Sequence, residues 1–169
     1  MEKTVIIYGD SGEKDLTKEI VRVCSENGGA LVYDGHRVFS TSDDPFYLVL
    51  SSDRLTDISI SDSIVVLGNE ADILTGKTEL TDCICVLDGD NKNAARFAAE
   101  CGADTVGCSM SGHDTLTVSG FNDDGTMLVT LRRKIGRTEP GEYIAHRHEG
   151  KDIYPVLAAI AVIMLMNSE

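Results

Sequence analysis

Residues 4–12 of the chain read TVIIYGDSG. The first five form a short apolar run rich in β-branched residues, which is typical of a buried strand, and a glycine turn follows at once. Beyond the turn, Leu16, Ile20 and Val23 recur at the spacing of an amphipathic helix. The stretch therefore predicts a strand, a glycine turn and a helix in succession.

Three later stretches, 46–50, 63–67 and 83–87, repeat the short and nearly continuous apolar pattern of residues 4–8. Such runs are expected of parallel strands that are covered on both faces. A further strand is expected at 30–33, with the hairpin-type turn Asp34-Gly35 leading into a return over 36–40. An alanine-rich helix should follow the strand at 83–87 and end near Gly102.

The second half of the chain has a different pattern of apolar residues. From Thr105 to about Ala145, short alternating segments are separated by turn residues, including the strong turn signal at 122–125, so we expect an antiparallel extension. A final helix should begin at the N-cap Asp152, accept Pro155 in its first turn and be buried on most sides. The fold class expected is α/β: one three-layer, P-loop-like domain over 1–169, with a mainly parallel sheet and helices on both faces.

Composition narrows the functional classes. The chain has 169 residues, 15 Lys and Arg against 28 Asp and Glu, and a net charge of −13. Polyanion binding draws on clustered basic residues, and the compact basic run is confined to Arg132-Arg133-Lys134, so we expect no nucleic-acid or membrane partner. The longest apolar stretch, 156–166, is shorter than the roughly 20 residues that cross a bilayer.

The start of the chain and its cysteines suggest a compartment. No basic and apolar leader precedes residue 4, which favours a cytoplasmic location. Five cysteines are present without CxxC spacing. In a reducing compartment such cysteines are expected to be small buried side chains rather than disulfides or redox centres. No metal site is expected either, because the usual zinc spacings are missing.

The glycine turn has the position of an anion site but not its chemistry. A strand, a glycine turn and a helix N-terminus can aim backbone amides at a phosphate. A working P-loop then places Lys and Ser/Thr after its last glycine, whereas here those positions carry Glu13 and Lys14. If the alignment is shifted so that Lys14 replaces the missing Lys, the Lys14 side chain points about 100° around the helix from the direction that a P-loop Lys takes. The sequence therefore predicts weak phosphate binding at this turn.

Five stretches, taken in order along the chain, resemble one known family: 5–12 (VIIYGDSG), 46–51 (FYLVLS), 63–69 (SIVVLGN), 85–91 (CVLDGDN) with the helix after it, and 150–161 (GKDIYPVLAAIA). Together they resemble the central, ATP-binding domain of the Mur ligases, which join amino acids to carboxylates through acyl phosphates. In the same order, the five stretches are similar to five parts of that domain. The first two match its G-T-x-G-K-[ST] loop and its strand with a metal-binding Glu. The last three match its strand ending in Asn, its V-L-N-x-D-D segment and its closing G-x-H-N-[VI]-x-N-x-x-A-A-x-A motif.

The chain departs from this family at the positions that carry chemistry. Glu13 and Lys14 replace the P-loop Lys and Ser/Thr, Ser51 replaces the metal-binding Glu, and Lys151-Asp152 replaces a His-Asn pair. The family's flanking domains have no counterpart, so the resemblance implies no complete ligase from this chain alone. It also implies that a vestigial cofactor site would lie at Gly9, Asp10, Ser11, Gly12, Glu13, Lys14, Asn69, Asp88, Asp90, Lys151 and Asp152.

Other chemical groupings have more ordinary interpretations. Glu13 and Asp15 could act as built-in anions at the phosphate turn, although acidic residues are common at helix starts. His146 and His148, with His113-Asp114, could ligate a metal, but they fit a solvated strand edge better. The segment 109–114 contains Ser, His and Asp yet lacks a nucleophile-elbow pattern, so a polar loop is expected.

These observations lead to two functional hypotheses. The first is a degenerate, stand-alone Mur-ligase-like domain without ligase activity and without a cofactor, which acts as a binding module for a protein partner or as a homo-oligomer. The alternative is an ATP-dependent ligase or nucleotide-binding subunit, using ATP and magnesium, that a separately encoded partner completes. Because function resides in a site rather than in a fold, the sequence leaves both open.

Overall fold

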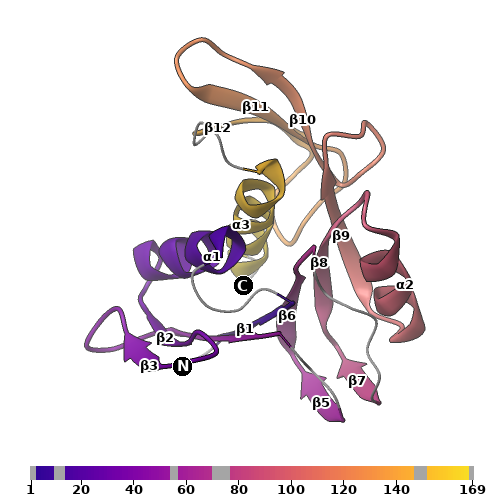
Figure 1. Cartoon of the computed structure of the whole chain (residues 1–169). Coiled ribbons are helices and arrows are strands. Elements are labelled where there is room, and N and C mark those ends of the chain that lie inside the picture. The colour runs from indigo at the N-terminus through magenta and orange to yellow at the C-terminus, as the bar shows by residue number, and fades with distance from the viewer. Residues whose placement is uncertain (1–2, 10–13, 54–56, 70–76, 147–151, 168–169) are drawn as a thin grey trace.

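The computed structural model describes residues 3–9, 14–53, 57–69, 77–146 and 152–167. Within this part of the chain, ten strands form one sheet (Figure 1). In chain order they are β1 (Lys3–Tyr8), β2 (Ala30–Tyr33), β3 (Val38–Ser40), β4 (Tyr47–Ser52), β6 (Ser63–Leu67), β8 (Ile84–Asp88), β9 (Asp104–Ser109), β10 (Leu116–Phe121), β11 (Thr126–Leu131) and β12 (Gly141–His146). Across the sheet the order is β12-β11-β10-β9-β8-β6-β1-β4-β2-β3.

The centre of the sheet is parallel, as expected from the continuous apolar runs. The first strand, β1, lies between β4 and β6, with Val5 opposite both Val49 and Ile64. The expected hairpin return at 36–40 is also present, because β3 pairs antiparallel with β2. These strands confirm a mainly parallel α/β sheet.

The antiparallel extension starts later than the sequence suggested. Strand β9 runs parallel to β8 over its whole length, and β10 meets β9 in a short parallel pairing of Leu116 with Cys108 and Thr117 with Ser109. Only β10, β11 and β12 form an antiparallel ribbon, closed at 122–125 by the expected turn. Placing the start of the extension at Thr105 was wrong, because β9 pairs in parallel with both of its neighbours and antiparallel pairing begins only between β10 and β11.

Helices cover both faces of the sheet. On one face lie α1 (Asp15–Glu26) and α3 (Ile153–Met166), and on the other lies α2 (Lys92–Glu100) (Figure 1). Alternate residues of β1 divide between the two resulting cores: Val5 and Ile7 face α1 and α3, while Ile6 and Tyr8 face the α2 side. The three expected layers are therefore confirmed.

The final helix is the most buried of the three described helices. Its N-cap is Asp152, and Pro155 lies in the first turn, as predicted. Eleven of its residues are buried, including Leu157, Ala158, Ala161 and Val162, each with no exposed surface. No described helix is long and apolar enough to span a membrane.

A second, two-stranded parallel sheet was not predicted. It consists of β5 (Ile58–Ser61) and β7 (Thr78–Thr81), which lead directly into β6 and β8. Figure 1 shows this pair projecting from the amino ends of β6 and β8. The backbone turns sharply between the two sheets at Asp62 and Asp82, whose φ angles are 49° and 53°.

Four of the five cysteines, Cys24, Cys83, Cys85 and Cys108, are buried, and all five are free thiols. Burial raises the pKa of Cys24 and of Cys85 to about 12. Thiols with such pKa values are protonated at neutral pH and unreactive, which agrees with the packing role predicted for them.

Candidate functional site

The candidate site lies where the parallel strands end. The carboxyl ends of neighbouring parallel strands meet at one edge of a sheet, and ligands of open α/β sheets bind outside that edge. Here backbone hydrogen bonds between neighbouring strands continue past the ends of the strands. The amide of Gly9 donates to the carbonyl of Ser52 at 2.8 Å, and that of Gly68 donates to the carbonyl of Tyr8 at 2.7 Å.

The loop after β8 brings two predicted residues together. The Asp88 carboxylate accepts a hydrogen bond from the Asp90 amide at 3.0 Å. Asn91 then caps α2 by accepting from the amides of Asn93 and Ala94, both at 3.1 Å. The Asn91 side chain also donates to the Asn69 carbonyl at 3.3 Å, which ties this loop to the end of β6.

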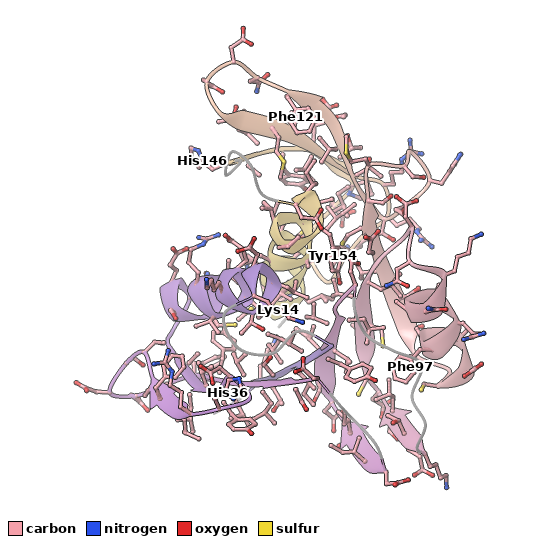
Figure 2. The ribbon with its side chains drawn as sticks, in the orientation of Figure 1. Lys14, His36, Phe97, Phe121, His146 and Tyr154 are labelled. Carbon is pink, nitrogen blue, oxygen red and sulfur yellow. The ribbon has the colours of Figure 1, made fainter. Side chains whose placement is uncertain are left out.

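The start of α3 supplies the opposite wall. The carboxylate of Asp152 accepts from the Tyr154 amide at 3.5 Å. The Tyr154 hydroxyl is buried between α3 and the sheet. Its oxygen lies 2.5 Å from the Leu67 carbonyl oxygen and 3.3 Å from the Val86 carbonyl oxygen. Figure 2 shows Tyr154 at the top of α3, next to the sheet. Tyr154 thus fixes the start of α3 over the ends of β6 and β8.

A cavity of about 380 Å³ lies between these loops and α3. Three of the predicted residues, Asp88, Asp90 and Asp152, line it together. The other described lining residues are Ser109, Met110, Ile153, Tyr154 and Leu157. The described wall is therefore part acidic and part apolar, and it contains no basic side chain.

The carboxylates of the cavity act on one another. The pKa of Asp88 is raised, first by its partial burial and then by repulsion from Asp90 and Asp152. Hydrogen bonds from the Asp90 amide and the Asn69 side chain offset part of this rise. The cavity consequently disfavours additional negative charge.

Of the predicted phosphate turn, the structure describes the two ends. Gly9 has a φ of 79°, a left-handed conformation that glycine adopts without strain. Lys14 is exposed and occupies the N-cap position of α1, where its side chain makes no capping hydrogen bond (Figure 2). Asp10, Ser11, Gly12 and Glu13 lie outside the described residues, as does Lys151.

Ser51, which stands where the resemblance places a metal-binding Glu, is not accessible to a ligand. Ser51 is fully buried, and its hydroxyl shares a 3.1 Å hydrogen bond with the hydroxyl of Thr17 on α1. A pair of neutral hydroxyls thus stands where the resemblance would place a carboxylate. Within the described residues, no three His, Cys, Asp or Glu side chains are arranged to hold a metal ion.

The sequence predicts a polar loop at 109–114 but not that Ser109 and Asp114 pair beside the cavity. The Ser109 hydroxyl forms a very short hydrogen bond with the Asp114 carboxylate and accepts another from the Ser111 amide at 2.9 Å. Two glycines make room for that carboxylate, since a Cβ on Gly89 or Gly107 would lie 2.0 or 2.5 Å from it. The pair is local in sequence, but the space for its carboxylate comes from both β9 and the turn after β8, which lie side by side only in the folded sheet.

The histidines do not gather with this pair. His113 is exposed in the loop before β10, and His146 is exposed at the end of β12. The fourth member of the proposed metal group, His148, lies outside the described residues.

Comparison with known proteins identifies relatives by fold only. No family model matches the chain, and no curated protein matches it in sequence. Several solved ligase structures do match in fold. The murein peptide ligase from Psychrobacter arcticus superposes with a TM-score of 0.57 and 10% identity, over 98% of this chain and 44% of its own.

Two further ligases give the same picture. MurF from Acinetobacter baumannii matches with a TM-score of 0.58 and 10% identity, over 99% of this chain and 43% of its own. The UDP-N-acetylmuramate:L-alanyl-gamma-D-glutamyl-meso-diaminopimelate ligase from Neisseria meningitides matches with a TM-score of 0.60 and 14% identity, over 98% and 62% respectively. The chain thus spans about half the length of the ligases it matches, and it has a Mur-ligase-like fold.

Proposed function

We propose that this Mur-ligase-like domain is a binding module that does not carry out ATP-dependent ligation. The observation that carries the proposal is the acidic cavity at the carboxyl edge of the sheet. Asp88, Asp90 and Asp152 line it, and the described wall contains no lysine or arginine. Nucleotide-dependent transfer needs the opposite, because the phosphates and their transition state are stabilised by cations and amides.

The energetics of the cavity support this proposal. Asp88 already has a raised pKa because burial and its neighbours disfavour its charge. A polyphosphate placed beside it would add repulsion, whereas a positively charged group would relieve it. The ligand or partner side chain that suits this wall is therefore cationic, with an apolar part that contacts Met110 and Leu157.

The buried hydroxyl pair supports it as well. Magnesium prefers carboxylate and water oxygens, and Ser51 offers a hydroxyl that Thr17 already engages. Restoring only the P-loop side chains would therefore leave the metal short of a ligand.

Titration calorimetry with ATP and magnesium tests the proposal. We expect no saturable binding below about 1 mM, which corresponds to about −4.1 kcal/mol. The matched variant carries Glu13→Lys and Lys14→Thr, which introduce the P-loop side chain types, and it should gain pyrophosphate or ADP binding without ligation. A micromolar dissociation constant for ATP in the unmodified protein would overturn the proposal.

A second candidate function rests on a different observation. The chain covers 43% to 62% of the ligases that share its fold, so a separate chain or another part of the same protein would supply what they hold in the remainder. Under this candidate the domain is a ligase or nucleotide-binding subunit. Micromolar ATP binding in the titration above would favour it.

A further inference from the structure

The long free edge of the main sheet is β12. Among the described strands, none pairs with the outer side of Gly141–His146, whereas its inner side pairs with β11 along its whole length. The opposite edge, β3, has only three residues. Short edge strands are one way in which proteins avoid further pairing, and a six-residue edge lacks that protection. Figure 1 shows β10 to β12 at the top of the view, where they extend the sheet beyond β9.

One face of β12 is exposed and carries three different side chains. Glu142, Ile144 and His146 alternate with the partly buried Gly141, Tyr143 and Ala145. Ile144 is 74% exposed, the largest exposed fraction among the large hydrophobic residues described. The described part of β12 contains no lysine or proline that would block a further strand.

We infer that β12 binds the β12 strand of a second copy of this chain, antiparallel, about a two-fold axis at Ile144. A two-fold axis perpendicular to the sheet keeps each face on its own side, so exposed residues oppose exposed residues. With the axis at Ile144, Ile144 lies opposite Ile144 of the other copy. Glu142 of each copy then lies opposite His146 of the other.

This register is chemically self-complementary. Directly opposed residues in an antiparallel pair have Cβ atoms about 4.5–5.5 Å apart, within reach of a Glu–His hydrogen bond. Histidine can donate that bond whether its ring is neutral or charged. On the other face Tyr143 lies opposite Ala145 twice, a large residue against a small one. The pairing thus opposes apolar with apolar and acid with base.

The neighbouring registers lack this complementarity. Moving the axis to Tyr143 places Glu142 opposite Ile144 and Tyr143 opposite itself. Moving it to Ala145 places Ile144 opposite His146. Both leave the exposed aliphatic side chain beside a polar one, so the axis at Ile144 is favoured.

A two-fold pairing would also limit the assembly to two copies. An isologous interface uses the same patch on both copies and closes on itself. In the dimer, the described edge of the main sheet that stays unpaired in each copy is the short strand β3. The expected product is a dimer with one continuous sheet, and not an open fibre.

Light scattering coupled to size-exclusion chromatography tests this assembly. We expect a dimer in the micromolar range and a monomer for Ile144→Lys, which places two cations on the axis. Glu142→Lys should weaken the dimer at least about tenfold, because it opposes lysine to histidine twice. The control is Val38→Lys on β3, where Val38 is 67% exposed, and it should leave the dimer unchanged.

The decisive variant exchanges the two charges. Glu142→His combined with His146→Glu keeps every opposed pair and should restore the dimer that either single change weakens. A monomeric wild type, or a dimer indifferent to Ile144→Lys, would overturn the proposal. So would a folded double variant, verified by circular dichroism, that remains monomeric.

Discussion

Two aspartates of this chain, Asp88 and Asp124, have surroundings that shift their pKa values in opposite directions. The pKa of Asp88 is raised by burial and by Asp90 and Asp152, so the folded state holds this proton to a higher pH than the unfolded state does. The pKa of Asp124 is lowered by hydrogen bonds from the Thr126 side chain and amide. Asp88 therefore lowers stability as pH rises through its range, and Asp124 lowers stability as pH falls through its own.

Replacing each aspartate by asparagine should reveal these opposite signs. At pH 7, Asp88→Asn should stabilise the fold, by no more than about 1 kcal/mol because solvent screens a partly exposed group. Asp124→Asn should destabilise it at the same pH. Both differences from wild type should shrink in acid, the Asp88 difference at higher pH than the Asp124 difference, because the pKa of Asp88 is raised and that of Asp124 is lowered. Urea unfolding at pH 7 and at about pH 3 measures this, and equal shifts at both values would contradict it.

The residues of the site were only partly predictable. Asp88 and Asp90 stand at and just after the end of a buried strand, and Asp152 stands at the start of a buried helix, so the elements that carry them had clear signals. Asp114 could not be placed in this way. Its carboxylate occupies space left by Gly89, in the turn after β8, and by Gly107 within β9, and neither glycine carries a local mark of that role.

At the scale of elements, two strands pass from the small sheet to the large one with the same bend. Residues 20 positions apart pair in both sheets, Ile58 with Thr78 and Ile64 with Ile84. At each bend stands an aspartate with a left-handed backbone, Asp62 or Asp82. Aspartate tolerates this conformation better than most residues do, and glycine tolerates it best.

Substitutions at the bend should therefore follow backbone preference. Asp62→Val should cost about 1–2 kcal/mol, because a β-branched residue is strained at positive φ, whereas Asp62→Gly should be close to neutral. Asp104→Val serves as a control, since Asp104 is also exposed but begins strand β9 with an ordinary backbone. Denaturant midpoints compare the three, and equal losses at both aspartates would count against the role of the bend.

The elements themselves were predictable where their burial was uniform. The runs at 63–67 and 83–87 are buried on both sides of the sheet, so their apolar residues are nearly continuous. β5 and β7 gave weak signals because each has only four residues, and Ile60 is the one buried residue among the eight. The direction of β9 was misjudged because direction depends on its neighbour and leaves little trace in its own residues.

At the scale of the whole molecule, one side chain joins distant parts of the chain. The Tyr154 hydroxyl lies near the carbonyls of Leu67 and Val86, which are 87 and 68 residues away. Leu67 is the last residue of β6, Val86 lies in the middle of β8, and the tyrosine itself is buried. This contact therefore couples the closing helix to the centre of the fold.

Tyr154→Phe should cost about 1–3 kcal/mol, because it removes a donor from a buried carbonyl. The matched control is Tyr143→Phe. The Tyr143 hydroxyl donates to the Glu139 carbonyl at 2.7 Å near solvent, so its loss should cost about 0.5 kcal/mol or less. Chemical unfolding of the two variants gives the comparison, and equal costs would show that Tyr154 acts through packing alone.

The placement of α3 has a consequence for synthesis on the ribosome. This helix follows every described strand in the chain, yet it covers β6, β8 and β9 and shares a core with α1. A nascent chain that has emerged only as far as β12 therefore carries the strands of the sheet with much of one apolar face still bare. Exposed surface of this kind is what chaperones bind, so translation of residues 153–166 ends the interval in which the chain is most prone to aggregate.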